Sequence, residues 1–195
     1  MTDIVDELLG VQPGSALAVL RDRRPETKDQ IQASYDALFS PVDDSAFAIT
    51  ERLLVAAFAA RLAGDDLLAG HFADRALLAD AGRAEVVLVE AVAAATSGPY
   101  GAYTEAGLQA ENTAGPVYRA DAARASLGDR LAAALEHAHL LVFRPRESAA
   151  SDLDALIEAG WSIDGIVTLS QLVSYLAFQQ RVVAGLRVLA EEAQA

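Results

Sequence analysis

The sequence predicts an all-α fold. Alanine and leucine, two of the strongest helix formers, dominate the 195 residues. Strict alternation of β-branched and polar residues, which would indicate half-buried strands, is rare. Hydrophobic residues make up 53% of the chain and charged residues 22%, so the chain can bury a core and is not intrinsically disordered. The length fits one domain.

Short helices are expected near the N-terminus, over residues 3–9 and 15–21. Pro25 suits the first turn of a third helix, because its fixed φ is helical and its missing N–H is not needed there. This third helix is expected over residues 25–38. We therefore interpret residues 1–44 as an N-terminal helical extension.

An apolar stripe opens the main domain, which we expect over residues 45–195. The stripe predicts a helix over 47–63, because its members recur at helical spacing. Its members are Phe47, Leu54, Phe58 and Leu62. A helix over 66–80 is expected next, with Gly82 as its stop, and a very apolar helix over 84–96 follows.

Residues 97–118 lack any regular pattern, because glycine and proline recur throughout this segment. A loop of this length in a compact domain is usually a lid, an arm at an interface or a mobile segment. Helical character resumes over 127–143 and is expected to end before Pro145.

Two serines are expected to start the last two helices. Ser151 and Asp154 have the spacing of a capping box, which predicts a helix that ends at Gly160. Ser162 is expected to cap the longest helix, which runs to about Glu191. The middle of this helix is apolar on nearly every side, so we expect it in the core or in a subunit interface.

A weak internal repeat is visible when the sequence is shifted by about 78 residues. Residues 45–97 then align with 124–191, with loop 97–118 between the two copies. Gly82 falls on Gly160 in this alignment, as a shared stop after a helix. The pattern predicts two related helical halves packed as one domain.

Charge and cysteine content exclude several classes of function. Fifteen basic residues against 28 acidic ones give a formal charge of −13, so binding to nucleic acid or to an anionic membrane surface is not expected. Without cysteine the chain has no thiol nucleophile and no thiolate ligand for zinc or iron–sulfur clusters. We expect no cofactor and no metal, and a cytoplasmic location, because the N-terminus lacks a secretory pattern and no apolar stretch is long enough to span a membrane.

Glu51 and His71 are the candidate catalytic residues. Each is expected on the core-facing side of its helix, Glu51 beside Leu54 and His71 beside Leu67 and Leu78. An unpaired buried carboxylate is costly, so Glu51 is expected to pair with His71 or with Arg52. Such a pair is either a proton relay or a structural hydrogen bond within the bundle.

Arg181, Tyr175 and His137 are the candidate substrate-binding residues. An arginine inside the apolar last helix needs a carboxylate, a helix C-terminus or a ligand anion, so Arg181 either forms an interfacial salt bridge or binds substrate. His137 and His139 are two residues apart and point to different faces, so one is expected in the core or an interface and the other on the surface. Trp161 is expected to fill the core beside the helix turn.

Two stretches of sequence resemble the alkylhydroperoxidase D/carboxymuconolactone decarboxylase superfamily. The first runs from Phe47 through Glu51 to His71, and the second is the pair of closing helices with Phe178 and Arg181. The resemblance covers about residues 45–189. It implies an all-helical bundle that assembles as a homo-oligomer, a dimer, trimer or hexamer.

The peroxidase branch of that superfamily carries a Glu, a CxxC pair and a His in order. The resemblance places the Glu at Glu51 and the His at His71, and it places the two cysteines at Gly64 and Leu67. Because neither position is cysteine, thiol peroxidase chemistry is excluded. Three functions stay open: proton transfer on a small organic acid or lactone, a non-catalytic oligomeric partner of a thiol-bearing relative, and binding of a small ligand.

Overall fold

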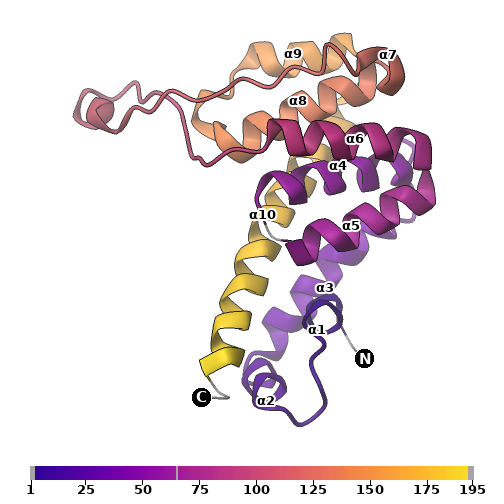
Figure 1. Cartoon of the computed structure of the whole chain (residues 1–195), viewed down its shortest axis with the longest axis vertical. Coiled ribbons are helices and arrows are strands. Elements are labelled where there is room, and N and C mark those ends of the chain that lie inside the picture. Colours follow the sequence, from indigo (N-terminus) through magenta and orange to yellow (C-terminus); the bar gives the residue numbers. More distant parts are fainter. Residues whose placement is uncertain (1–2, 65, 193–195) are drawn as a thin grey trace.

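The computed structural model describes residues 3–64 and 66–192, and over these residues the fold is all-α, as predicted. No strand occurs among them (Figure 1). The helices are α1 (Ile4–Leu9), α2 (Ala16–Asp22), α3 (Pro25–Phe39), α4 (Ile49–Leu62), α5 (Asp66–Ala79), α6 (Ala81–Ala94), α7 (Arg124–Leu127), α8 (Asp129–Phe143), α9 (Ala150–Glu158) and α10 (Ile163–Glu192), with short 3-10 turns η1 (Ala106–Glu111) and η2 (Pro145–Glu147).

The core is built around α4. This helix packs against α5, α6, α8 and α10, so it is buried on nearly every side. The predicted stripe lies inside this core, and Leu54 and Phe58 are fully buried. Helix α10 runs from α4 and α8 down to the N-terminal helices (Figure 1). Burial of its first half, including Leu172, confirms that this apolar helix belongs to the core.

The N-terminal helices share this core rather than standing apart from it. Ile4, Val5 and Ile31 are buried in the same apolar cluster as α4 and α10. Ion pairs also connect these helices: Arg21 of α2 pairs with Asp6 of α1 and with Asp3 just before it, and Lys28 of α3 also pairs with Asp6. Asp3 additionally caps α1, because its carboxylate accepts hydrogen bonds from two backbone N–H groups of the first turn.

The expected stop at Gly82 is wrong. Asp80 caps α6 by accepting a hydrogen bond from the N–H of Arg83, so Gly82 is the second residue of that helix. Gly160 does end α9, with a φ of 90° that favours glycine. The two aligned glycines therefore play different structural roles, and the internal repeat loses the observation that best supported it.

Of the two predicted N-terminal caps, the one for α9 is wrong and the one for α10 is confirmed. The N-cap of α9 is Ala149, two residues before the predicted Ser151, and its N–H donates to Asp152 at 2.8 Å; because alanine has no side-chain acceptor, the reciprocal half of a capping box is missing. Ser162 accepts a hydrogen bond from the N–H of Gly165 at 3.2 Å and caps α10 as predicted.

Residues 97–118 form the predicted loop, which we call the arm. Figure 1 shows it reaching away from the helices, with η1 near its tip. The arm is not featureless: Gly101 and Thr113 exchange two backbone hydrogen bonds of 2.8 and 3.1 Å, and Asn112 accepts one from the N–H of Tyr103. Within the described residues, no helix combines the length and apolarity that crossing a bilayer requires.

Candidate functional site

Glu51 does not pair with His71 or with Arg52, so that prediction is wrong. Its carboxylate accepts hydrogen bonds of 3.0 and 3.3 Å from Nε of Arg130, which lies on α8. Arg52 instead donates to the backbone oxygens of Phe47 and Leu38, each at 2.7 Å, and so satisfies the C-terminal end of α3.

Arg130 also explains why Glu51 faces inward. Its other two nitrogens donate to the carbonyl oxygens of Gly160 and Ala46, both at 2.8 Å. The guanidinium lies 3.9 Å from the centroid of the Trp161 ring, and the indole N–H of Trp161 donates back to the Arg130 carbonyl. Trp161 is buried as predicted. With every group matched, Glu51 and Arg130 fasten α4, α8 and the turn before α10.

His71 finds a different partner, the hydroxyl of Tyr35. The hydroxyl oxygen lies 3.1 Å from Nε2 of His71, which joins α3 to α5. Arg75, one turn after His71, donates a hydrogen bond to the same hydroxyl. Leu78 does not share the buried face of His71 as predicted, because it lies at the end of α5 and is 89% exposed. We refer to Tyr35, His71 and Arg75 as the Tyr–His–Arg cluster.

Burial and nearby charges set the protonation states of His71 and Tyr35 at neutral pH. Burial lowers the pKa of His71, and the neighbouring Arg75 guanidinium lowers it further, against smaller opposing effects of Glu7 and Asp74. Burial raises the pKa of Tyr35, with Arg75 opposing. His71 is therefore neutral and Tyr35 protonated. Since Arg75 can only donate to the Tyr35 oxygen, the hydroxyl proton is free to point to Nε2 of His71.

Arg75 is held by aromatic rings rather than by an acid. Its guanidinium lies 5.6 Å from the ring centroid of Tyr35 and 5.2 Å from that of Phe39. Among the described residues, no carboxylate lies within ion-pair distance of Arg75. The cluster thus combines a proton acceptor, a proton donor and a cation with a free edge, and all three side chains are partly exposed.

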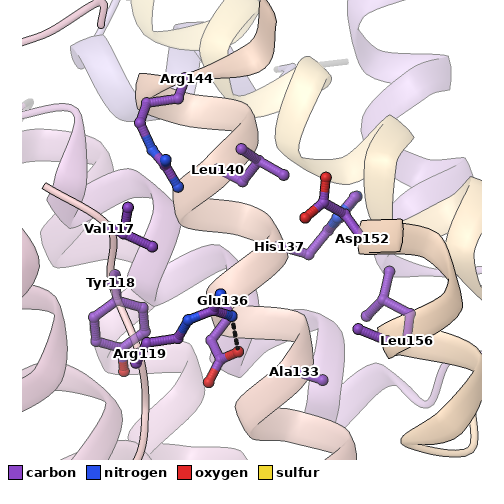
Figure 2. A pocket seen from close by; sticks show the side chains of 11 residues that line it. Val117, Tyr118, Arg119, Ala133, Glu136, His137, Leu140, Arg144, Asp152 and Leu156 are labelled. Carbon is purple, nitrogen blue, oxygen red and sulfur yellow. Dashed lines mark hydrogen bonds and ion pairs between the residues drawn. The ribbon is translucent and has the colours of Figure 1, made fainter. Parts of the chain in front are cut away.

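His137 lies beside a small cavity of about 50 Å³ between residues 117–119, α8 and α9. Figure 2 shows α8 as its floor, with Val117, Tyr118 and Arg119 on one side and Asp152 on the other. A cavity lined by polar groups and of this size has room for a few water molecules.

The polar groups around this cavity are largely engaged with one another. Glu136 accepts hydrogen bonds from Arg119 at 3.0 Å and from Arg124 at 2.8 Å (Figure 2 draws the first). The pKa of His137 is lowered by burial, with Asp152 opposing. Nε2 of His137 lies 3.3 Å from the hydroxyl of Ser170, and Nδ1 is buried without a hydrogen-bond partner.

Both histidines of α8 are buried, so the expectation that one of them lies on the surface is wrong. His139 packs against the rings of Tyr118 and Phe143, with centroids at 5.5 and 4.9 Å. The two imidazoles point to different sides of α8, and other parts of the chain cover both sides. The sequence of α8 alone does not indicate this, because the covering elements lie elsewhere in the chain.

Arg181 and Tyr175 lie on α10 and are engaged separately. Arg181 is exposed and donates to the carbonyl of Ala177 in its own helix at 2.7 Å, so the predicted buried arginine with an anionic partner is not observed. Tyr175 is buried, its hydroxyl donates to the carbonyl of Ile31 at 3.4 Å, and burial raises its pKa. The structure thus does not join these residues and His137 into one hydrogen-bonded site.

Sequence reasoning missed Tyr35 and Arg75. Arg75 is four residues after His71 and therefore shares its helical face, so this signal was available in the sequence. Tyr35 carried no such signal, because it lies in another helix 36 residues away. Within the described part of the chain, no group of three or more His, Asp or Glu side chains is arranged to hold a metal ion.

Comparison with family models, with curated proteins and with solved structures gives no match to this chain. The side-chain geometry is therefore the basis for assigning a function.

Proposed function

We propose that the chain is a cytoplasmic, cysteine-free relative of the alkylhydroperoxidase D/carboxymuconolactone decarboxylase superfamily that transfers protons on a small organic acid or lactone. The Tyr–His–Arg cluster is the proposed reaction centre. This assignment keeps His71 in the catalytic role that the resemblance implies. It moves the partner of His71 from Glu51 to Tyr35, and Glu51 becomes a structural residue.

One observation carries the proposal: the Tyr35 hydroxyl lies between Nε2 of His71 and the guanidinium of Arg75. A neutral imidazole hydrogen-bonded to a phenol forms a two-step proton relay. The lowered pKa of His71 keeps its Nε2 available as an acceptor at neutral pH. Arg75 supplies a positive charge at the oxygen where negative charge develops during transfer.

The relay balances without any further reagent. The Tyr35 oxygen accepts a proton from the carbon next to the substrate carbonyl, while the hydroxyl proton of Tyr35 moves to Nε2 of His71. The electron pair of the broken C–H bond stays on the substrate as an enolate. The proton that Tyr35 has taken from carbon exchanges with solvent, so in heavy water the reversal of both transfers places deuterium on carbon.

Deuterium uptake therefore tests the proposal. A panel of small carboxylic acids and lactones is incubated with the protein in D₂O, and loss of the α-proton signal is followed by NMR. Tyr35→Phe and His71→Gln should each slow exchange by about 10²–10⁴-fold, the usual contribution of a positioned acid or base. Glu51→Gln serves as the matched control and should keep the wild-type rate once its stability is confirmed. Exchange that survives Tyr35→Phe, or no exchange by the wild-type protein on any substrate, contradicts the proposal.

An exposed apolar stripe on α10 favours a second candidate function. Val167, Phe178 and Leu189 follow one another at intervals of 11 residues, which is close to three helical turns, and they are 50, 45 and 46% exposed. Such a stripe fits a non-catalytic protein that associates through α10, either with a second copy of this chain or with a thiol-bearing relative. Sedimentation of the wild-type protein should then give an oligomer that Phe178→Glu dissociates, with Val42→Glu, at an exposed site away from the stripe, as the control. A wild-type monomer contradicts self-association.

A further inference from the structure

Arg75 differs from the other shielded arginines in the partners of its guanidinium. Arg21 pairs with Asp3 and Asp6, Arg83 with Asp80, and Arg130 with Glu51. Arg52, which also has no carboxylate within ion-pair distance among the described residues, donates instead to the backbone carbonyls of Phe47 and Leu38. The guanidinium of Arg75 has neither kind of partner among these residues and donates to the Tyr35 hydroxyl. For Arg75 no carboxylate lies within ion-pair distance among the described residues, although the side chain is only partly exposed. A cation that is partly removed from water and lacks an acidic partner is a costly arrangement that a bound anion relieves.

The orientation of Arg75 is also fixed in the way that anion recognition requires. The rings of Tyr35 and Phe39 hold the guanidinium, and one nitrogen is used by the Tyr35 hydroxyl. A guanidinium packed against aromatic rings keeps its remaining N–H groups along its edge, where two parallel hydrogen bonds to a planar carboxylate form. Less side-chain entropy is then lost when a ligand binds.

We propose that Arg75 is the residue that binds the carboxylate of the substrate, so that the Tyr–His–Arg cluster acts on small monocarboxylate anions rather than on neutral lactones. This inference rests on the proposed function, because it names the substrate class of the same cluster. Glu7, Asp36 and Asp74 act electrostatically on Tyr35 or His71. Their negative charge, together with a formal charge of −13 for the chain, disfavours dianions such as phosphate.

Binding itself gives a readout that is independent of turnover. A carboxylate held by Arg75 brings negative charge next to His71, and an adjacent negative charge raises the pKa of an imidazole. The bound anion thus makes His71 easier to protonate, and the affinity for the anion increases as the pH falls toward the pKa of His71.

The test is an NMR titration of the full chain, following the side-chain Nε–H of Arg75 and the ring of His71. The probes are propionate, inorganic phosphate and γ-butyrolactone, which represent a monocarboxylate, a dianion and a neutral lactone. Propionate should shift both groups saturably and raise the pKa of His71, phosphate should bind at least tenfold more weakly, and the lactone should leave the Arg75 signal unchanged. Saturable binding of the lactone with an affinity equal to that of propionate, or no response to propionate, overturns the inference.

Variants separate this inference from the proposed function. Arg75→Gln should weaken propionate binding at least tenfold, and Arg75→Lys should recover only part of it, because lysine keeps the charge but loses the planar fork. Arg61→Gln, at an exposed arginine that pairs with Asp66, is the matched control and should bind normally. If propionate binds in this way but no substrate exchanges its proton, the role of Arg75 in binding a carboxylate stands and the proposed function fails. If lactones exchange and Arg75→Gln has no effect, the proposed function stands and the inference fails.

Discussion

Loss of the Arg130 side chain should destabilise the fold, because its guanidinium interacts with four neighbouring groups. Arg130→Met removes the ion pair to Glu51, the hydrogen bonds to the carbonyls of Gly160 and Ala46, and the contact with Trp161. Hydrogen bonds to a charged group contribute about 1.5–3 kcal/mol each when buried. The Arg130 side chain is 31% exposed, so water replaces part of this loss. We expect a decrease of about 2–4 kcal/mol in the free energy of unfolding.

Urea denaturation followed by circular dichroism measures this decrease. Glu51→Gln should cost about 1 kcal/mol, and the double variant should show a coupling of about 1 kcal/mol between the two side chains, because the pair is not fully buried. Arg130→Lys keeps the charge and isolates the contribution of the planar fork. A loss below about 1 kcal/mol for Arg130→Met, or no coupling to Glu51, refutes the structural role that we assign to this pair.

Three further predictions concern the core, a close backbone approach and pH. Leu54→Ala should cost about 2–5 kcal/mol in chemical denaturation, because Leu54 is fully buried in α4 and its removal leaves a cavity; a cost under 1 kcal/mol contradicts the packing. Gly165→Ala should lower the melting temperature, because the added Cβ would lie 2.7 Å from the Ala46 carbonyl oxygen. Gly185→Ala should raise the melting temperature, because the added Cβ meets open space within α10 and alanine favours the helix. A higher melting temperature for Gly165→Ala than for Gly185→Ala would contradict the packing at the start of α10. Stability should be fully present above the unfolded histidine pKa of about 6.5 and should fall as the pH drops below it, because burial lowers the folded pKa of three histidines; urea midpoints that are equal at pH 7.5 and pH 5 contradict this. The three residues are His71, His137 and His139.

Local signals in the sequence predicted the helices well, because the relevant interactions are local. Pro25 begins α3, Ser162 caps α10, and the stripe that contains Leu54 lies in the core. The failure at Gly82 has a physical reason: glycine inside a helix costs only about 1 kcal/mol, so the cap at Asp80 and the packing of α6 on α4 decide where the helix begins.

The side-chain partners that lie on other helices could not be predicted from local sequence patterns. Helical periodicity correctly turned Glu51 inward, but it cannot identify the residue that faces it, and Arg130 lies 79 positions further along the chain. The same limit hid Tyr35 from His71. Arg181 shows the reverse error, since apolar neighbours in the sequence suggested burial, while its own side of α10 is exposed.

The central claim, that His71 works with Tyr35 and not with Glu51, can be tested by measuring the pKa of His71 by NMR in three proteins. In the wild type this pKa should lie below the ordinary value of 6.5, because the imidazole is partly buried next to Arg75. Tyr35→Phe removes the hydroxyl that donates to the neutral imidazole, so the pKa should rise, whereas Glu51→Gln should leave it unchanged. A pKa that responds to Glu51→Gln and ignores Tyr35→Phe would contradict the account.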